Sequence, residues 1–184
     1  MTTPRTIHSA SHYQRREIHE LLQSIFIAEL VSPSKHIWLV SPWVSDIAVL
    51  DRTMDPSASL IGDTTGSTIR LSEVLVTLAE LGTCITIVTK PNEKASISFC
   101  ETLRQRATRS TANECITIIT KDELHTKGLL GDGYRLLGSM NFTFNGVQQN
   151  DETVTFDCEP AAIGQTRMAF EQDYPVPTTD HRTE

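Results

Sequence analysis

Long apolar runs are missing from the 184-residue sequence: no stretch approaches the roughly 18 to 20 apolar residues that a membrane-spanning helix needs. The opening segment MTTPRTIHSASHYQRREIHE also lacks the apolar core of a secretory signal. We therefore expect a protein that does not associate with a membrane and is located in the cytoplasm.

Cysteine is scarce, and its spacing is uninformative for metal binding. No CxxC pair occurs, and the cysteines stand among apolar neighbours, at Cys84, Cys100, Cys115 and Cys158. This pattern argues against a zinc site or a disulfide framework and favours buried free thiols in a reducing compartment. We expect neither a metal nor another cofactor.

Positive charge is also in short supply. The 16 Lys and Arg residues are outnumbered by 23 Asp and Glu residues, which gives a formal net charge of -7. This balance argues against a surface that coats nucleic acid indiscriminately, but it allows a local basic groove. One group of side chains forms either such a basic flank or an ordinary solvated surface: Lys94, Arg104, Arg106, Arg109 and Lys121.

The sequence does contain alternating helix and strand patterns. Apolar residues at helical spacing predict a long first helix over residues 13–30. A second helix is predicted to begin at Ser72 as its N-cap and to stop at Gly82. Further helices are predicted at 92–110 and 161–174, and strands at 37–41, 83–89, 115–121, 125–132, 134–141 and 151–159. This order predicts an α/β/α sandwich with a mixed central sheet and helices on both faces.

The length suits a single domain, predicted to span residues 13–174. Residues 1–12 are polar and aperiodic and are predicted to be flexible, as is the tail at residues 175–184. Residues 50–70 are rich in Asp, Ser, Thr and Gly and form a long loop insertion, expected to be either functional or disordered.

The segment LHTKGLLGD places a histidine two residues before a lysine. On a strand, His125 and Lys127 would share one face and be held side by side. Such a pair alone is more often an ordinary surface or core feature than a catalytic one. Downstream, GSMN places Ser139 and Asn141 on one face, and Gly138 permits a close backbone approach. With Lys127, these side chains are suited to bind phosphate oxygens.

Glu152 adds a carboxylate that can hold one imidazole nitrogen and leave the other free to attack. Together these residues resemble the HxKxxxxD and GSxN signature of the phospholipase D superfamily: His125, Lys127 and Asp132, followed by Gly138, Ser139 and Asn141. The continuation FTFNGVQQNDE and the segment SPWV after the first predicted strand are also similar to that family.

The resemblance implies hydrolysis or transfer of phosphodiesters without a metal, by two His-x-Lys motifs in one site. This chain has a single copy, so the second is expected from another subunit, in a homodimer that shares one active site. The implied roles are nucleophile or general acid for His125 and phosphate binding for Lys127, Asn141 and Ser139. Glu152 is expected to orient His125. The signature also places Asp132 among the candidate catalytic residues, but strand alternation would turn it away from the pair, which favours a supporting or structural role.

Short single-motif members of the superfamily are mostly nucleases, which favours DNA or RNA as the substrate. Two alternatives stay open: a non-catalytic module that binds nucleic acid or a partner, and a phospholipase or phosphatidyltransferase. Trp43 is expected either to stack on a base of the substrate or to serve as a core or interface aromatic. Residues 21–47 resemble small phospholipase D-like proteins of bacterial DNA-modification or phage-defence systems, which implies other subunits of such a system as partners.

Overall fold

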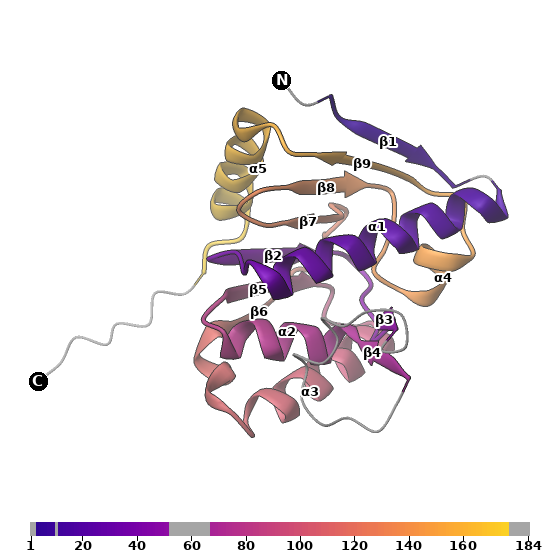
Figure 1. The fold of residues 1–184 in the computed structure, drawn as a ribbon. Helices are drawn as coiled ribbons and strands as arrows, with labels where there is room; N and C mark the ends of the chain where they lie inside the picture. Colours follow the sequence, from indigo (N-terminus) through magenta and orange to yellow (C-terminus); the bar gives the residue numbers. More distant parts are fainter. Residues whose placement is uncertain (1–2, 10, 52–66, 177–184) are drawn as a thin grey trace, which may run out of the picture.

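A seven-stranded mixed sheet forms the centre of the molecule in the computed structural model (Figure 1). The structure describes residues 3–9, 11–51 and 67–176. In spatial order the strands are β1 (Arg5–His8), β9 (Thr153–Asp157), β8 (Arg135–Gly138), β7 (Gly128–Leu130), β2 (His36–Val40), β5 (Cys84–Thr89) and β6 (Ile116–Thr120). The strands β2, β5 and β6 run parallel, and the remaining neighbours are antiparallel.

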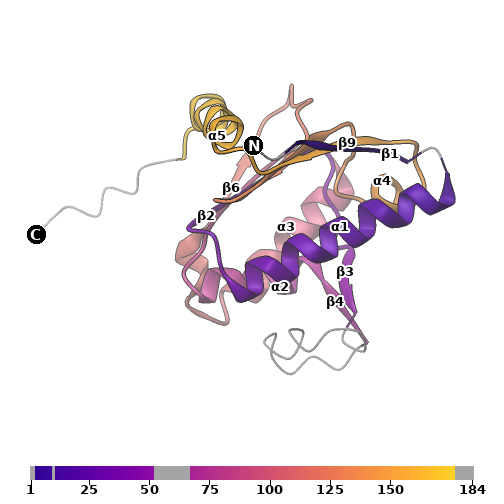
Figure 2. The ribbon, with the colours of Figure 1, turned by 45° about the horizontal axis from the view of Figure 1, so that its top comes forward.

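Helices cover both faces of this sheet (Figure 2). One face carries α1 (His12–Val31), α2 (Leu71–Glu80) and α3 (Lys94–Ala107), and the other carries α5 (Pro160–Asp173). Two short helices complete the fold, the 3-10 helix η2 (Thr111–Cys115) and α4 (Phe144–Gln148). The predicted α/β/α sandwich is confirmed.

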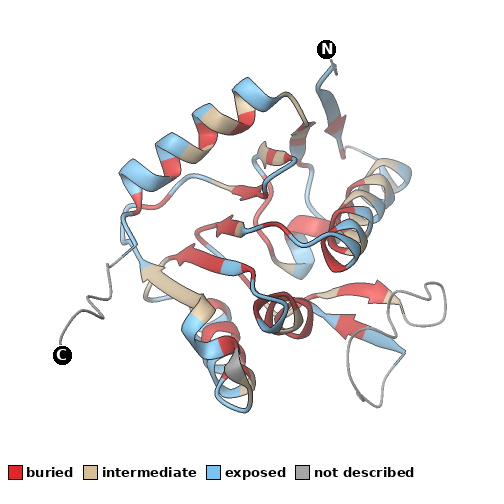
Figure 3. Cartoon of the chain, turned by 60° about the vertical axis from the view of Figure 1, so that its left-hand side comes forward, coloured by how far each residue is buried: buried red, intermediate tan, exposed pale blue. Residues whose placement is uncertain are grey.

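The central strands are apolar on both sides because each side packs against helices. Ile37 and Leu39 of β2 belong to the large core beneath α1, α2 and α3. Trp38 and Val40 alternate with them and belong to a smaller core that includes Ile163, Phe170 and Tyr174, on α5 and directly after it. Figure 3 shows the buried residues concentrated on the strands and on the sheet-facing sides of the helices.

The predicted flexible N-terminus is wrong for Arg5–His8, which form the edge strand β1. The register pairs β1 with β9, and only Ile7 of the four residues is buried. Such a short polar segment has little strand signal of its own, because its order comes from a partner about 145 residues away in the chain. Ser11 then caps α1 through reciprocal hydrogen bonds with Gln14.

The start of α2 also differs from the prediction. Its N-cap is Arg70, whose backbone N–H donates to Glu73 Oε2 at 2.7 Å. Ser72 lies inside the first turn, where its N–H and hydroxyl donate to the carboxylate of Asp46. The tertiary partner Asp46 therefore replaces the local cap. At the other end, Gly82 has φ +95° and stops the helix as predicted.

The predicted loop at 50–70 is partly ordered. Its two ends contribute to β3 (Ala48–Asp51) and β4 (Thr68–Arg70), which pair antiparallel as a separate two-stranded sheet. Residues 52–66 lie outside the described residues. The expectation of buried thiols holds for Cys100 alone, since Cys84 is exposed at the start of β5 and the other two cysteines are half-buried.

A partly buried ion pair joins β8 to β9, and it leads to a prediction about the pH dependence of stability. Asp157 Oδ2 accepts from Nε and Nη2 of Arg135 at 3.2 and 2.8 Å, and Oδ1 accepts from the backbone N–H of Glu159 at 2.9 Å. The Glu159 backbone hydrogen bond, followed by the contacts with Arg135, lowers the pKa of Asp157 below its usual value. The ionised carboxylate therefore stabilises the fold above the unfolded-state pKa, and this contribution is lost as the pH falls through the folded-state pKa.

We expect Asp157→Asn to lower the free energy of unfolding at pH 7, and the difference from wild type to shrink at acid pH. Urea unfolding at a series of pH values measures this. The exposed Asp173 of α5 provides a control, because Asp173→Asn removes a carboxylate without breaking the Arg135 pair. A difference that stayed constant down to pH 2 would contradict the assignment.

Candidate active site

Four ends of strands meet at one edge of the sheet. Ser41 follows β2, Lys127 precedes β7, Ser139 follows β8 and Glu152 precedes β9. The register pairs Val40 with Gly128, Gly128 with Leu137, and Gly138 with Val154. Because β7 is antiparallel to both β2 and β8, and β8 to β9, these junctions lie side by side. The sheet thus brings together segments more than a hundred residues apart in the chain.

The His-x-Lys segment is not part of a strand, contrary to the prediction that the strand begins at residue 125. The strand β7 begins at Gly128, and residues 124–127 belong to no helix or strand, although the Lys127 carbonyl accepts from the backbone N–H of Gly138 at 3.4 Å. The partner strand β2 ends at Val40 and is soon followed by Pro42, which has no N–H to continue a ladder. His125 is exposed, and Lys127 is half-buried with its Nζ donating to the carbonyl of His125 at 2.8 Å.

The imidazole of His125 has no hydrogen-bond partner within the described residues, so Glu152 does not orient it in this chain as expected. Instead, Ser139 Oγ donates to Glu152 Oε2 and Asn150 Nδ2 donates to Oε1 at 3.3 Å. The backbone N–H of Glu152 donates to Ser9 Oγ at 2.7 Å. Ser139 and Glu152 are therefore brought together as a pair, in which the buried carboxylate accepts from two side chains and the backbone of Glu152 is bound to Ser9.

Asn141 is buried beside the segment that follows β2. Its Oδ1 accepts from Ser41 Oγ at 3.2 Å, and an isolated parallel bridge joins Val44 to Phe142. The backbone here is tightly folded: a Cβ at Gly146 would overlap the carbonyl oxygen of Asn141. GSMN and SPWV both contribute to this region, but Ser41 is not among the predicted site residues. The signal for it was its place directly after a buried strand.

The sequence profile of the family described as "Cardiolipin synthase, PLD-like domain" matches residues 26–174. The chain belongs to the phospholipase D-like family. Among solved structures it is similar to Nuc, a phospholipase D family member from Salmonella typhimurium, with a TM-score of 0.56 and 16% identity over 92% of both chains. No curated protein matches the sequence.

Two further structures show the same fold. NucT from Helicobacter pylori matches with a TM-score of 0.58 and 13% identity, over 92% of this chain and 94% of that one. Phosphatidylserine synthase from Haemophilus influenzae matches with a TM-score of 0.54 and 14% identity, over 93% of this chain but 37% of that one. The phospholipase D-like domain thus has nearly the full length of Nuc and NucT and about a third of the synthase.

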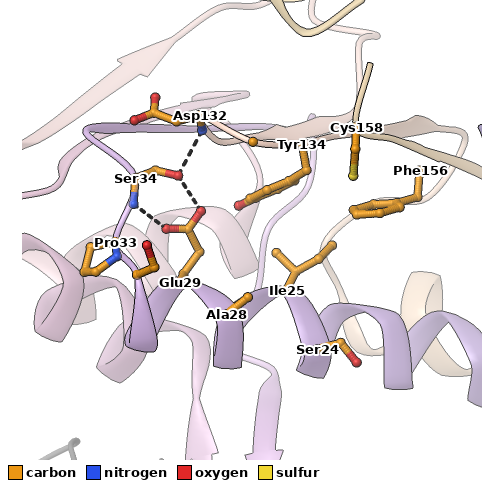
Figure 4. A pocket seen from close by; sticks show the side chains of 12 residues that line it. Ser24, Ile25, Ala28, Glu29, Pro33, Ser34, Asp132, Tyr134, Phe156 and Cys158 are labelled. Atoms are coloured by element: carbon orange, nitrogen blue, oxygen red, sulfur yellow. Dashed lines mark hydrogen bonds between the residues drawn. The ribbon is translucent and has the colours of Figure 1, made fainter. Parts of the chain in front are cut away.

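Asp132, the aspartate of the phospholipase D signature, comes after β7 and therefore lies at the opposite edge of the sheet. Figure 4 shows it beside Ser34. Its Oδ2 accepts from the backbone N–H of Lys35 at 2.7 Å, and its Oδ1 accepts from Arg167 Nη2 at 3.0 Å. Its own N–H donates to Ser34 Oγ, which donates to the buried carboxylate of Glu29 at 2.6 Å. Asp132 thus makes contacts within the fold, and it is separated from His125 and Lys127 by the length of β7 rather than by strand alternation.

A cavity of about 500 Å³ adjoins this network. Tyr134 lines it, with its hydroxyl end towards Glu29 (Figure 4). Burial raises the pKa of the Tyr134 hydroxyl well above its usual value, and the neighbouring Glu29 carboxylate adds to the effect. This phenol therefore stays protonated at neutral pH, and the edge around Asp132 is a packed polar junction between α1 and the sheet.

Two side chains of the predicted basic flank have partners within the fold. Arg106 is bound to the carboxylate of Glu73 at 3.4 Å, which withdraws it into a contact between α3 and α2. Lys121 lies over the ring of Tyr174 at 5.0 Å. Arg104 lines a depression of about 200 Å³ together with Lys90, at the carboxyl end of β5. Only part of the expected flank therefore faces the sheet edge that carries His125.

Neither a metal site nor a membrane span emerges from the described ranges. No group of three or more His, Cys, Asp or Glu residues within them is arranged to hold a metal ion. None of the described helices has the length and apolarity to cross a bilayer.

Proposed function

We propose that this protein is a metal-independent nuclease that cleaves phosphodiesters through a phosphohistidine intermediate, at an active site shared by two copies of the chain. Phosphodiesterase-type chemistry is supported by its membership of the phospholipase D-like family. The observation that carries the proposal is the gathering of Lys127, Ser139, Asn141 and Glu152 at one sheet edge, next to an imidazole that has no partner in the described residues.

In the first step, a ring nitrogen of His125 attacks phosphorus and forms a P–N bond while the P–O bond to the leaving group breaks. The leaving oxygen takes a proton from the second copy's imidazole. That imidazole then removes a proton from water, the water oxygen attacks phosphorus, and the P–N bond breaks. Lys127 and Asn141 stabilise the negative charge that grows on the phosphoryl oxygens. The Lys127 ammonium has three donors, so it can keep its bond to the His125 carbonyl.

The proposed homodimer follows from the number of His-x-Lys motifs in the chain and from the solvent exposure of that motif. The mechanism needs two imidazoles on opposite sides of one phosphate, and the chain supplies a single His-x-Lys motif. His125 and Thr126 are exposed, so the edge is open to a second copy. A two-fold axis at this edge would place the two His125 side chains around one phosphate, since a closed dimer repeats the same surface on both subunits.

Nucleic acid is the substrate class that the size of the domain favours. The chain covers 92% and 94% of Nuc and NucT, whereas it covers 37% of the phosphatidylserine synthase. The matched region thus agrees in length with Nuc and NucT, which supports the expectation that short single-motif members of the superfamily are nucleases. A partnership with subunits of a defence or DNA-modification system stays a prediction.

The test is cleavage of single- and double-stranded DNA and RNA by the purified protein, with and without EDTA. We expect cleavage that EDTA leaves unchanged. Quenching under alkaline denaturing conditions should trap a phosphorylated peptide that contains His125, detectable by mass spectrometry. Phospholipid vesicles in parallel reactions report on lipid turnover. Binding without turnover would favour the non-catalytic module, and loss of cleavage on chelation would contradict the mechanism.

A further inference from the structure

A depression of about 350 Å³ adjoins the candidate active site on the side of Asn141. Asn141 lines it and also belongs to the phosphate-binding group, so the depression begins where the proposed phosphate site ends. The lining comes from the segment after β2, from the start of α3 and from the region around α4, and includes Trp43, Asn141, Thr143, Phe144, Asn145 and Asn150.

Two aromatic side chains of this depression are left largely in solvent. Trp43 is 47% exposed and Phe144 is 52% exposed, although both are large apolar residues. Their backbones are held together, because Val44 bridges to Phe142 and the N–H of Ser45 donates to the carbonyl of Phe142 at 2.8 Å. A pair of exposed rings on a fixed backbone provides faces on which a planar ring can stack without much loss of conformational freedom.

The rest of the lining is uncharged and rich in amides. Asn145 is exposed, and within the described residues its side chain forms no hydrogen bond. Asn150 uses its Nδ2 to donate to Glu152, which leaves its Oδ1 as an acceptor towards the depression. Amide side chains offer both donors and acceptors, which match the polar edges of a nucleobase. A phosphate or a fatty acyl chain would not be matched by this combination of rings and neutral amides.

We propose that the depression holds one unstacked nucleobase next to the phosphate that is cleaved, so that the substrate is single-stranded or locally unpaired nucleic acid. This inference rests on the proposed nuclease function and names its substrate class. A base within a duplex has both faces covered by its neighbours and its pairing edge occupied. It can use Trp43, Phe144 and the asparagines only after it leaves the stack.

Tryptophan fluorescence tests binding independently of cleavage. Of the two tryptophans, Trp38 is 1% exposed and Trp43 is 47% exposed, so a change on binding reports on Trp43. The His125→Ala protein, which is not expected to turn over, is titrated with an oligothymidylate and with a duplex of the same length. We expect quenching by the single strand, a much smaller effect of the duplex, and no quenching in the double variant that also carries Trp43→Phe. Equal quenching by both ligands, or quenching that persists without Trp43, would overturn the proposal.

Cleavage provides the second test. An abasic site is moved through a single-stranded DNA oligonucleotide around its main cut, and rates are compared for wild type, Trp43→Ala and Phe144→Ala. In wild type we expect one abasic position next to the cut to lower the rate by about tenfold, because base stacking on an aromatic ring contributes at this level. In the variants, the intact oligonucleotide should be cut up to about tenfold more slowly than by wild type, and the further loss from that abasic site should be smaller than in wild type.

Tyr13→Ala is the matched control, since Tyr13 is a 73% exposed aromatic residue on α1, and it should behave as wild type. The alternative is that a second copy of the chain occupies the depression. Analytical ultracentrifugation of each variant tests this by measuring its oligomeric state. If Trp43→Ala or Phe144→Ala dissociates the dimer, the rings form the subunit interface and the base subsite is wrong. If wild type cuts no nucleic acid at all, the nuclease proposal fails while the fluorescence titration still decides whether a base binds here.

Discussion

Alanine in place of His125 is expected to lower the rate of phosphodiester cleavage by about 10³-fold or more, because in the proposed mechanism it removes the attacking nitrogen in one subunit and the proton donor in the other. The side chain is exposed and forms no hydrogen bond within the described residues, so the fold should be unaffected. Initial rates on a labelled oligonucleotide, with the unfolding midpoint measured alongside, separate loss of chemistry from loss of structure.

Thr126→Ala is the control for this experiment, since Thr126 is the exposed neighbour in the same segment and has no proposed role. Mixed dimers provide a sharper test of the shared site. When wild type and His125→Ala chains are refolded together in equal amounts, random pairing leaves about a quarter of the dimers with two intact histidines. Activity should fall to about a quarter of that of wild type. A value near a half would mean that each subunit works alone.

Gly138→Ala is expected to be among the most destabilising single changes in the chain. A Cβ at this position would overlap the carbonyl oxygen of Thr153 and come within 2.8 Å of the Val154 Cα, both of them backbone atoms of the paired strand β9. The strands would have to separate, at a cost of about 2 to 3 kcal/mol in the free energy of unfolding. Because Ser139 and Glu152 adjoin this point, activity should fall as well.

Gly164→Ala is the matched control, because Gly164 lies within α5 and an added Cβ would meet nothing within 4 Å. Alanine is the better helix former, so this change should raise the free energy of unfolding by about 0.5 to 1 kcal/mol. If β8 and β9 approach closely at Gly138, urea unfolding should show a lower free energy of unfolding for Gly138→Ala and a higher one for Gly164→Ala. Equal small effects at both positions would show that β8 and β9 can move apart without cost.

The sequence contained enough information to predict most of the architecture. The first helix was predictable because Ile18, Leu22 and Ile25 repeat at helical spacing and face the core. The close approach at Gly138 was also predicted correctly. The failures share a cause: β1 depends on β9, and the cap of α2 depends on Asp46, a partner 26 residues away from Ser72. Local patterns carry no record of such tertiary partners.

In the candidate site, too, some features were predictable from the sequence and others were not. The spacing within the segments around His125 and Ser139 was sufficient to choose the residues, and the sheet does gather most of them at one edge. The partners of each side chain were not predictable. Glu152 was expected to meet His125, yet it is held by Ser139 and Asn150, while Ser9 and Ser41 reach the site from distant segments. Hydrogen-bond pairing depends on rotamers and on register, which residue spacing does not encode.

The strand β7 sets the distance between the lysine and the aspartate of the signature. Its three residues, with one more at its far end, separate Lys127 from Asp132, a distance of about 17 Å for an extended chain. The proposed chemistry lies at the Lys127 end of β7. At the other end, Asp132 is bound to Ser34, which contacts α1, and to Arg167 of α5. The spacing between the lysine and the aspartate is therefore set by the length of the strand β7 rather than by the reaction. These contacts of Asp132 do not involve the proposed active site, so that aspartate alone is poor evidence that a relative is an enzyme.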